Sequence, residues 1–326
     1  MEKRMLIALA AFFALCSLPA AGKVDTAYVA KLPACWKIKL SGNCSGVFFD
    51  AYNSTLVEPV NVDLESDLRT KVALGFGYGG LMLNIGFNPA SFAKNQTDIE
   101  LSLSCYRNTF GFDLNYRHSK TLHGTISAPP GFHADVQKGN ATHQILQGGM
   151  YYAVNHKRFS YPAAFKQTFL QKKSAGSLLV GLSGTWQHIR VGEIEHVTRE
   201  AMRFSTVDIA LGCGYGYNFA ITERLLFHLS VMPAMVFGVG RKCSFNYREQ
   251  AFRYRFPEGA VTAKSALVWH VGRFSMGLSA DYRYLYTGRR EELCITSQIW
   301  NANAFVDVRF GKKGKLPPLR KKYISY

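Results

Sequence analysis

The segment from Ala302 to Phe310 alternates apolar and polar side chains more regularly than any other part of the chain. One face carries alanine, valine and phenylalanine. The other carries asparagine, aspartate and arginine, interrupted only by Phe305. A side-chain period of two is the pattern of an extended strand with one apolar and one charged face. The pattern recurs along most of the chain, which indicates a closed β-barrel whose apolar face meets lipid and whose polar face lines the interior.

The beginning of the chain has the features of a secretory signal peptide. Lys3 and Arg4 form a positive region, residues 5–15 form an apolar stretch, and residues 19–22 supply small side chains for cleavage. The apolar stretch is shorter than the about 20 residues that a membrane-spanning helix needs. Export through a signal peptide and a barrel pattern together predict a location in a bacterial outer membrane.

We expect a single domain after the signal peptide, because no linker and no change in composition divides the middle of the chain. The predicted division is a signal peptide at 1–22, an outer-membrane β-barrel at 23–311 and a basic C-terminal tail at 312–326. The tail holds lysine and arginine but no acidic residue, within a chain of net charge +17. An exported protein rarely meets nucleic acid, so the tail is expected to touch anionic lipid or another envelope component, or to lack a specific partner.

The spacing of the strand-like runs predicts an all-β, antiparallel up-and-down transmembrane barrel of about 12 strands, within a range of about 10–14. Short turns alternate with long connections, as in bacterial outer-membrane barrels, where the short turns face the periplasm. The predicted short turns lie at 79–80, 106–108, 220–224 and 271–273. The predicted long connections lie at 89–97, 119–143, 188–204, 238–260 and 286–295. Segment 156–176 is long although it falls on the short-turn side, and we expect it to fold into the barrel or to cap its periplasmic mouth.

The main alternative is a soluble β-sandwich or lipocalin-like barrel, in which the apolar face of each strand points inward. The extent of the apolar face and the aromatic residues near strand ends favour the membrane barrel, because aromatic girdles form at membrane interfaces. The aromatic residues in such positions are Trp186, Tyr215, Tyr217, Trp269, Tyr282, Tyr284, Trp300 and Phe310.

Charges of both signs fall on the polar face of the predicted strands. These residues are Asp98, Glu100, Asp113, Arg117, Asp208, Lys264, Asp281, Arg283, Asp307 and Arg309. An isolated charge inside a narrow barrel is costly, so we expect these side chains to pair with one another. Long side chains can largely fill a barrel of this size. Structural pairing is therefore the expected role of these charges, with selective passage or ligand binding as alternatives.

Six cysteines follow the signal peptide, and an even number in an exported chain permits disulfide bonds. Cys35 and Cys44 are close enough in sequence to close a small loop. Cys105 and Cys213 stand in phase with apolar strand residues and are expected to act as small hydrophobic residues. No cysteine has a zinc-ligand spacing, so the sequence predicts neither a metal nor a cofactor.

The most distinctive stretch of the chain lies in the long segment on the short-turn side. Residues 155–165, followed by 171–177, resemble the core motif of a Bacteroidetes family of unknown function, domain-of-unknown-function family 4421. The stretch 75–81 and the strand 110–114 resemble further elements of that family. The resemblance spans about residues 25–311 and implies an outer-membrane-type barrel with no assigned activity. The motif residues whose role it leaves open are His156, Lys157, Arg158, Phe159, Ser160, Tyr161, Gln171, Lys172, Lys173, Ser174 and Gly176.

No catalytic motif, such as a nucleophile elbow or a zinc-protease helix, occurs in the sequence. The leading hypothesis is therefore a non-enzymatic outer-membrane barrel that acts as a narrow or plugged channel, a ligand-binding protein or an envelope scaffold. The alternative is an outer-membrane enzyme that acts on lipid or lipopolysaccharide and uses His156, Ser160 and Ser174. The expected partners are outer-membrane lipid, lipopolysaccharide and the barrel-insertion machinery, for which Phe310 is the terminal aromatic signal.

Overall fold

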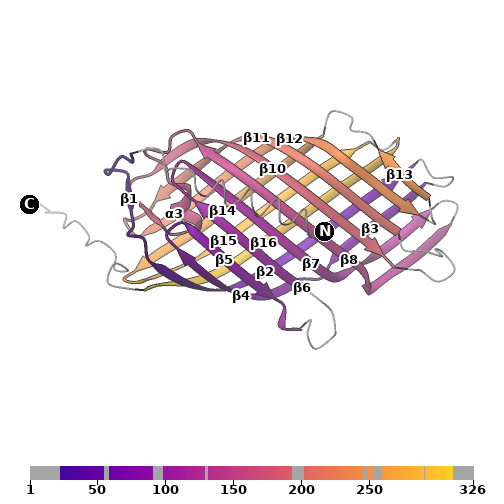
Figure 1. Ribbon diagram of the computed structural model, residues 1–326, viewed down its shortest axis with the longest axis horizontal. Helices are drawn as coiled ribbons and strands as arrows, with labels where there is room; N and C mark the ends of the chain where they lie inside the picture. The colour runs from indigo at the N-terminus through magenta and orange to yellow at the C-terminus, as the bar shows by residue number, and fades with distance from the viewer. Residues whose placement is uncertain are drawn as a thin grey trace, which may run out of the picture.

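The computed structural model describes residues 23–54, 59–90, 98–128, 131–192, 202–245, 248–252, 258–289 and 291–310. The predicted signal peptide and the whole of the predicted basic tail lie outside these residues. Within the described part, one antiparallel sheet curls round and closes on itself (Figure 1). No helix in this part is both long and apolar enough to cross a membrane.

Twelve of the described strands form the closed ring, and each pairs antiparallel with its neighbours. In chain order they are β2 (Trp36–Asn53), β4 (Arg69–Tyr78), β5 (Leu81–Phe87), β6 (Asp98–Tyr106), β7 (Phe110–Ala128), β8 (Phe132–Ala153), β10 (Ala175–Val191), β11 (Met202–Ala220), β12 (Leu225–Phe245), β14 (Gly259–Val271), β15 (Phe274–Gly288) and β16 (Leu293–Phe310). The last strand pairs with the first along its whole length, from Leu293 opposite Asn53 to Phe310 opposite Trp36. The predicted up-and-down barrel of about 12 strands is confirmed.

Four short strands in the described part lie outside the ring. β3 (Val60–Ser66) pairs with β2 and β7, and it extends the wall above the shorter strands β4, β5 and β6. β13 (Arg248–Phe252) pairs with β12 at the same end of the barrel. β1 (Val29–Lys31) and β9 (Phe169–Gln171) pair with each other at the opposite end, beside the helix α3 (Tyr161–Phe165) (Figure 1).

The four predicted short turns are confirmed at one end of the barrel, with Gly79 and Gly272 in the left-handed conformation that tight turns need. The predicted connection 89–97 agrees with the strand bounds, whereas the other four predicted long connections are wrong in extent. β7 and β8 continue through most of 119–143, and the ladder of β15 and β16 reaches the pair Gly288 and Cys294. Backbone groups beyond the membrane still need partners, and the ladders continue past the apolar outer band.

The outer surface of the barrel is apolar along much of the wall. On β2, for example, Trp36 and Leu40 are 66% and 57% exposed, while the alternate residues Lys37 and Ser41 are buried. Exposed large hydrophobic side chains occur on every strand of the ring except β7, whose described side chains are buried or half-buried, so eleven of the twelve strands contribute to the band. Soluble proteins rarely expose apolar areas of this extent, so this band is the lipid-facing surface of a transmembrane barrel.

The interior differs between the two ends of the barrel. Towards the short turns, the inward side chains include many polar ones, such as Lys37 and His228. Towards the long connections, they form an apolar core that includes Val47, Phe49, Val62, Leu122 and Phe204. The expectation of a polar lining is therefore wrong at this end. The wall here extends past the apolar outer band, so the protein buries its hydrophobic side chains inward, as a soluble β protein does.

All six cysteines of the described residues are free. The disulfide that the spacing of Cys35 and Cys44 would permit is therefore not formed. Cys213 is exposed on the outer face, as its apolar phase predicted, whereas Cys105 is buried against Phe112 near the short turns.

Candidate functional site

Residues 155–174, which we call the plug, enter the short-turn end of the barrel. Pro162 lies in the first turn of α3, where its missing N–H costs nothing. Ala163 and Ala164 are fully buried, and their small side chains let the helix pack closely against the wall and β1. The helix contacts β9, β11, β12 and β14. The prediction that segment 156–176 folds into the barrel or caps its mouth is confirmed.

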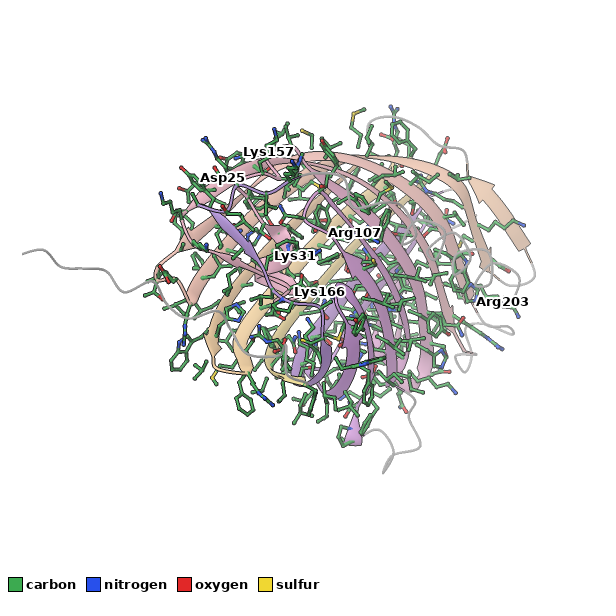
Figure 2. The ribbon with its side chains drawn as sticks, turned by 60° about the vertical axis from the view of Figure 1, so that its left-hand side comes forward. Asp25, Lys31, Arg107, Lys157, Lys166 and Arg203 are labelled. Atoms are coloured by element: carbon green, nitrogen blue, oxygen red, sulfur yellow. The ribbon has the colours of Figure 1, made fainter. Side chains whose placement is uncertain are left out.

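The N-terminal segment, residues 23–35, crosses the same mouth and holds the plug from outside. Val29 to Lys31 pairs with Phe169 to Gln171. The Asp25 N–H donates to the Lys157 carbonyl at 2.9 Å, and Figure 2 shows these two residues side by side at the rim. Deeper in the mouth, Lys37 Nζ donates to the carbonyl of Lys166 at 2.5 Å. Both ends of the plug are therefore tied to other parts of the chain.

Gln171 is the residue of the family motif with the most hydrogen bonds. Its Oε1 accepts from the Ser160 N–H at 2.9 Å and from Asn218 Nδ2 at 3.0 Å. Its Nε2 donates to the carbonyls of Arg158 and Lys173 at 2.6 and 2.8 Å. This buried side chain thus joins the two halves of the plug to each other and to β11.

Four basic residues of the plug point outward, unlike Lys166, which lines a cavity in the lumen. Lys157, Arg158, Lys172 and Lys173 are all exposed. Arg158 Nε lies 3.6 Å from Asp25 Oδ2, and Lys172 Nζ donates to the Thr26 carbonyl at 2.9 Å. Lys172 and Lys173 point away from the inner wall, because the plug turns its aromatic face inward.

The structure does not join the three residues that the sequence offered for a hydrolase site. His156 Nδ1 lies 3.3 Å from the Ala153 carbonyl. Ser174 Oγ accepts from the Ala220 N–H at 3.0 Å. Ser160 Oγ is buried and has no hydrogen-bond partner.

The remaining motif residues have structural contacts. The Phe159 and Tyr161 rings are buried and lie with their centroids 6.4 Å apart. Gly176 packs so closely on β11 that a side chain there would collide with the Tyr215 hydroxyl. These contacts fix where the plug meets the wall.

Between the plug and the apolar end, the lumen contains a polar chamber. It comprises a cavity of about 310 Å³ and an adjoining cavity of about 190 Å³, which share lining residues such as Asn43, Glu100 and Asp281. Its basic lining residues are Lys39, Lys71, Arg117, Lys166, Lys264 and Arg283. Its acidic lining residues are Glu100, Asp113 and Asp281. The chamber therefore has more positive than negative side chains.

Part of this charge is paired, as predicted. Lys71 Nζ lies 3.1 Å from Asp98 Oδ1 and 3.0 Å from Glu100 Oε2, and Arg117 lies 3.3 Å from Glu100. Nearer the apolar end, Arg241 bridges Asp208 and Glu258. The sequence did not identify Lys71, Arg241 and Glu258 as partners, because cross-strand neighbours depend on register.

Other charges of the chamber are not paired. Within the described residues, Lys39, Lys166, Lys264 and Arg283 form no ion pair, so the predicted pairing is wrong for Lys264 and Arg283. Lys39 Nζ instead lies 3.9 Å from the centre of the Phe305 ring, and Lys166 Nζ lies 4.9 Å from that of Tyr106. Burial lowers the pKa of the Lys166 ammonium group. In the part of the chain that the structure describes, no group of three His, Cys, Asp or Glu side chains could hold a metal ion.

A second cavity, of about 610 Å³, lies at the short-turn end between the N-terminal segment and the turns after β4 and β6. Tyr106 lines both this cavity and the chamber. Its hydroxyl donates to Asp113 Oδ2, and its ring packs edge-on against Tyr151 at 5.4 Å between centroids. Tyr106 thus stands between the two spaces.

A hydrogen-bonded array on β11 and β12 was not found from the sequence. His228 Nδ1 lies 2.6 Å from Asn218 Oδ1, and His228 Nε2 lies 3.0 Å from Ser230 Oγ. Ser230 lines the chamber. The spacing of His228 and Ser230 on one strand face was a visible signal, but the facing Asn218 depends on the register of two strands.

These features define a transmembrane β-barrel whose lumen is filled at one end by a plug and at the other by an apolar core. The chain belongs to the family described as "Domain of unknown function (DUF4421)", whose model matches residues 23–310. A search of curated proteins found no significant match.

Several solved outer-membrane proteins have similar folds at low identity. The outer membrane protease OmpT from Escherichia coli has a TM-score of 0.45 at 8% identity, covering 86% of this chain and 98% of that one. The translocator domain of the autotransporter NalP from Neisseria meningitidis has a TM-score of 0.35 at 10% identity, covering 95% of both chains. Neisserial surface protein A has a TM-score of 0.28 at 11% identity, covering 83% of this chain and 97% of that one.

Proposed function

We propose that this protein is an outer-membrane barrel that does not act as an open diffusion channel and that binds a small, negatively charged molecule in its chamber. The observation that carries the proposal is the closure of the lumen on both sides of the chamber. The plug fills the short-turn end with fully buried residues such as Phe159 and Ala163. The apolar core fills the other end. A molecule that crossed the barrel would have to displace both.

The charge of the chamber supports the negative sign of the ligand. Within the described residues, four cations of the chamber form no ion pair: Lys39, Lys166, Lys264 and Arg283. Two carboxylates of the chamber, those of Asp113 and Asp281, also form no ion pair there. A buried charge without a counter-ion costs several kcal/mol. A bound carboxylate or phosphate would offset this cost and would itself be recognised by the chamber.

The setting of the protein follows from the same reasoning. We place it in the outer membrane, after removal of residues 1–22, with its apolar band in contact with lipid and lipopolysaccharide. The barrel-insertion machinery is its assembly partner. The resemblance of the plug segment to its family implies an origin in the Bacteroidetes. The exposed basic residues Lys157, Arg158, Lys172 and Lys173 lie at the periplasmic mouth in this arrangement.

Conductance in planar bilayers tests the closed lumen. The wild-type protein should show no conductance steps over a range of salts, with flotation of proteoliposomes as proof of insertion. Ala163→Arg alone and Phe204→Asp alone should remain silent, because each disturbs only one closure. The double variant should conduct. Regular steps from the wild type would contradict the proposal.

Thermal unfolding in detergent tests the ligand, with inorganic phosphate as the probe and sodium chloride at matched ionic strength as the reference. Phosphate should raise the melting temperature of the wild type, because a ligand stabilises the state that binds it. Arg283→Met should remove the shift, whereas Lys138→Met, which changes an exposed residue near Asp67, should keep it. An identical shift in all three proteins would contradict a site in the chamber.

The alternative function, an enzyme acting on lipid or lipopolysaccharide, gains no support from His156, Ser160 and Ser174, which contact different groups. Release of fatty acid by the purified protein, and its loss in Ser174→Ala, would be needed to sustain that assignment. A different set of residues has the geometry of a nucleophilic site.

A further inference from the structure

The array of Asn218, His228 and Ser230 has its hydrogen-bond directions fixed by its surroundings. Asn218 Nδ2 donates to the Ser160 carbonyl at 2.8 Å and to Gln171 Oε1 at 3.0 Å. Both of these atoms are acceptors, so the amide oxygen of Asn218 is the atom that faces His228. That oxygen can only accept. His228 Nδ1 must therefore carry the proton that it donates across 2.6 Å.

This tautomer leaves a lone pair on the other ring nitrogen. A neutral imidazole protonated on Nδ1 accepts at Nε2. The Ser230 hydroxyl, 3.0 Å away, is therefore the donor to His228 Nε2. A serine that donates to a histidine whose far nitrogen is held by a third group is the arrangement that activates a serine nucleophile.

The plug supplies the surroundings of the array. The rings of Phe159, Tyr161 and Phe165 lie with their centroids 6.0, 5.2 and 5.1 Å from that of His228. These rings exclude water from the imidazole, and this burial favours its neutral form, which can accept a proton at Nε2. The same plug contributes the Ser160 carbonyl and Gln171 that orient Asn218.

Ser230 is reached from the chamber, and donors stand beside it. Tyr161 and Lys264 line the chamber together with Ser230, and Lys264 Nζ lies 6.0 Å from the centre of the Tyr161 ring. Burial raises the pKa of the Tyr161 phenol, which keeps it protonated and able to donate. Donors next to a nucleophile can stabilise the negative oxygen that develops when it attacks a carbonyl group.

We propose that Ser230 is the nucleophile of a second, catalytic function of this chamber: the cleavage of a small carboxylic ester that carries a negative charge. Its general base is His228, and Asn218 is a positioning residue that acts through His228. Lys264 and Arg283, which line the same chamber, select the charge of the substrate. The proposal uses the chamber but does not require that a phosphate-like ligand also bind there.

The reaction balances with water as the only co-reactant. The Ser230 Oγ forms a bond to the ester carbonyl carbon while its proton moves to His228 Nε2. The bond from that carbon to the alcohol oxygen breaks, and the leaving alcohol takes the proton from His228. Water then attacks the acyl group on Ser230 and gives a proton to His228. Ser230 leaves, takes that proton back, and the carboxylic acid is released.

Covalent labelling with diisopropyl fluorophosphate tests the nucleophile. The protein is treated after folding and, separately, is folded from urea in the presence of the reagent, so that entry into the closed lumen does not decide the result. Mass spectrometry of peptides should find the phosphoryl group on Ser230. Ser275 is the internal control. Like Ser230, it is buried and hydrogen-bonded to a histidine, with its Oγ 2.8 Å from His270 Nδ1. Unlike Ser230, it accepts a hydrogen bond from Arg309 at 2.7 Å.

His228→Gln separates catalysis from structure. The glutamine amide can still donate to Asn218 and accept from Ser230, so the fold should be kept, as heat-modifiable migration would show. Without a base, labelling of Ser230 should slow about a hundredfold. Absence of the label from wild-type Ser230 in both protocols, an equal rate in His228→Gln, or equally fast labelling of Ser275 would overturn the proposal.

Turnover of two activated esters tests the substrate class. The wild type should hydrolyse 4-nitrophenyl hemisuccinate, which carries a carboxylate, faster than the neutral 4-nitrophenyl acetate, and Ser230→Ala should hydrolyse neither above background. A preference for the neutral ester would overturn the assignment of a negatively charged substrate. Because phosphate binding is read separately by thermal unfolding, failure of the ester reaction is distinguishable from failure of the proposed ligand site.

Discussion

The rings of Phe49 and Phe204 lie 5.7 Å apart between centroids, although they come from strands that do not pair with each other. Along the shorter way round the ring, β16, β15, β14 and β12 separate β2 from β11. The contact therefore crosses the lumen. It shows that the barrel is closed near the long connections by side-chain packing from opposite walls.

Phe49→Ala should reduce the free energy of unfolding by about 3–5 kcal/mol, because it removes a fully buried ring from this apolar core. Urea unfolding in lipid vesicles, followed by tryptophan fluorescence, measures the change. Phe48→Ala is the matched control. The Phe48 ring is 39% exposed on the outer face, so its removal should lower the free energy of unfolding by about 1 kcal/mol. Equal losses for the two variants would contradict the closure of this end.

Gln171→Ala should release the plug. It leaves the Ser160 N–H, Asn218 and two carbonyls without their partner, at a cost of about 3 kcal/mol. Trypsin should then cut after Lys172 or Lys173 far faster than in the wild type, where both side chains are exposed but the Lys172 N–H donates to the Tyr28 carbonyl at 2.7 Å. Gln187→Ala is the control, because Gln187 Nε2 is buried without a hydrogen-bond partner. Rapid cleavage of the wild type would show that the plug is not docked.

Lys71→Met should destabilise the barrel by about 3–5 kcal/mol, because it leaves Asp98 and Glu100 short of the cation that both share. The measurement is again urea unfolding in vesicles. Lys138→Met removes an exposed partner of Asp67 and should change the stability by at most about 1 kcal/mol. An unchanged free energy of unfolding in Lys71→Met would mean that Asp98 and Glu100 do not need Lys71 as their counter-ion.

Phe310→Asp should sharply reduce the amount of protein in the outer membrane. Phe310 is the last residue of β16 and is exposed on the outer face opposite Trp36, so aspartate would place a charge at the lipid interface. Immunoblots of membrane fractions and heat-modifiable migration measure assembly. Phe310→Trp keeps an aromatic terminus and should assemble normally, whereas normal abundance of Phe310→Asp would contradict the prediction.

The alternation of single strands predicted much of the fold. Ala302 to Phe310 forms part of β16 as expected, and the turns at 79–80 and 271–273 join adjacent strands. These features are local, since side-chain period and turn residues act over a few positions. The parity of turns also assigned the plug to the short-turn end, which the structure confirms.

Alternation separates two faces of a strand, but it does not tell how far along the barrel a residue lies. On β2, Lys37 and Phe49 point to the same inner side, yet Lys37 lies near the plug and Phe49 lies in the apolar core. The environment of an inward residue depends on whether lipid or water surrounds the wall at that level. Only the closed barrel fixes that level.

The chemistry of the chamber was likewise decided by tertiary structure. The sequence alone determined that this chain forms an antiparallel membrane barrel with a long segment on its short-turn side. Asn218 faces His228 because β11 and β12 pair in one register, and the plug residues Ser160 and Gln171 complete the array from another part of the chain. A shift of one residue in that register would turn the side chains of the strand to the opposite face. The local periodicity of side chains determines the two faces of a strand, whereas the packing of the whole barrel determines the strand register and the position of the plug.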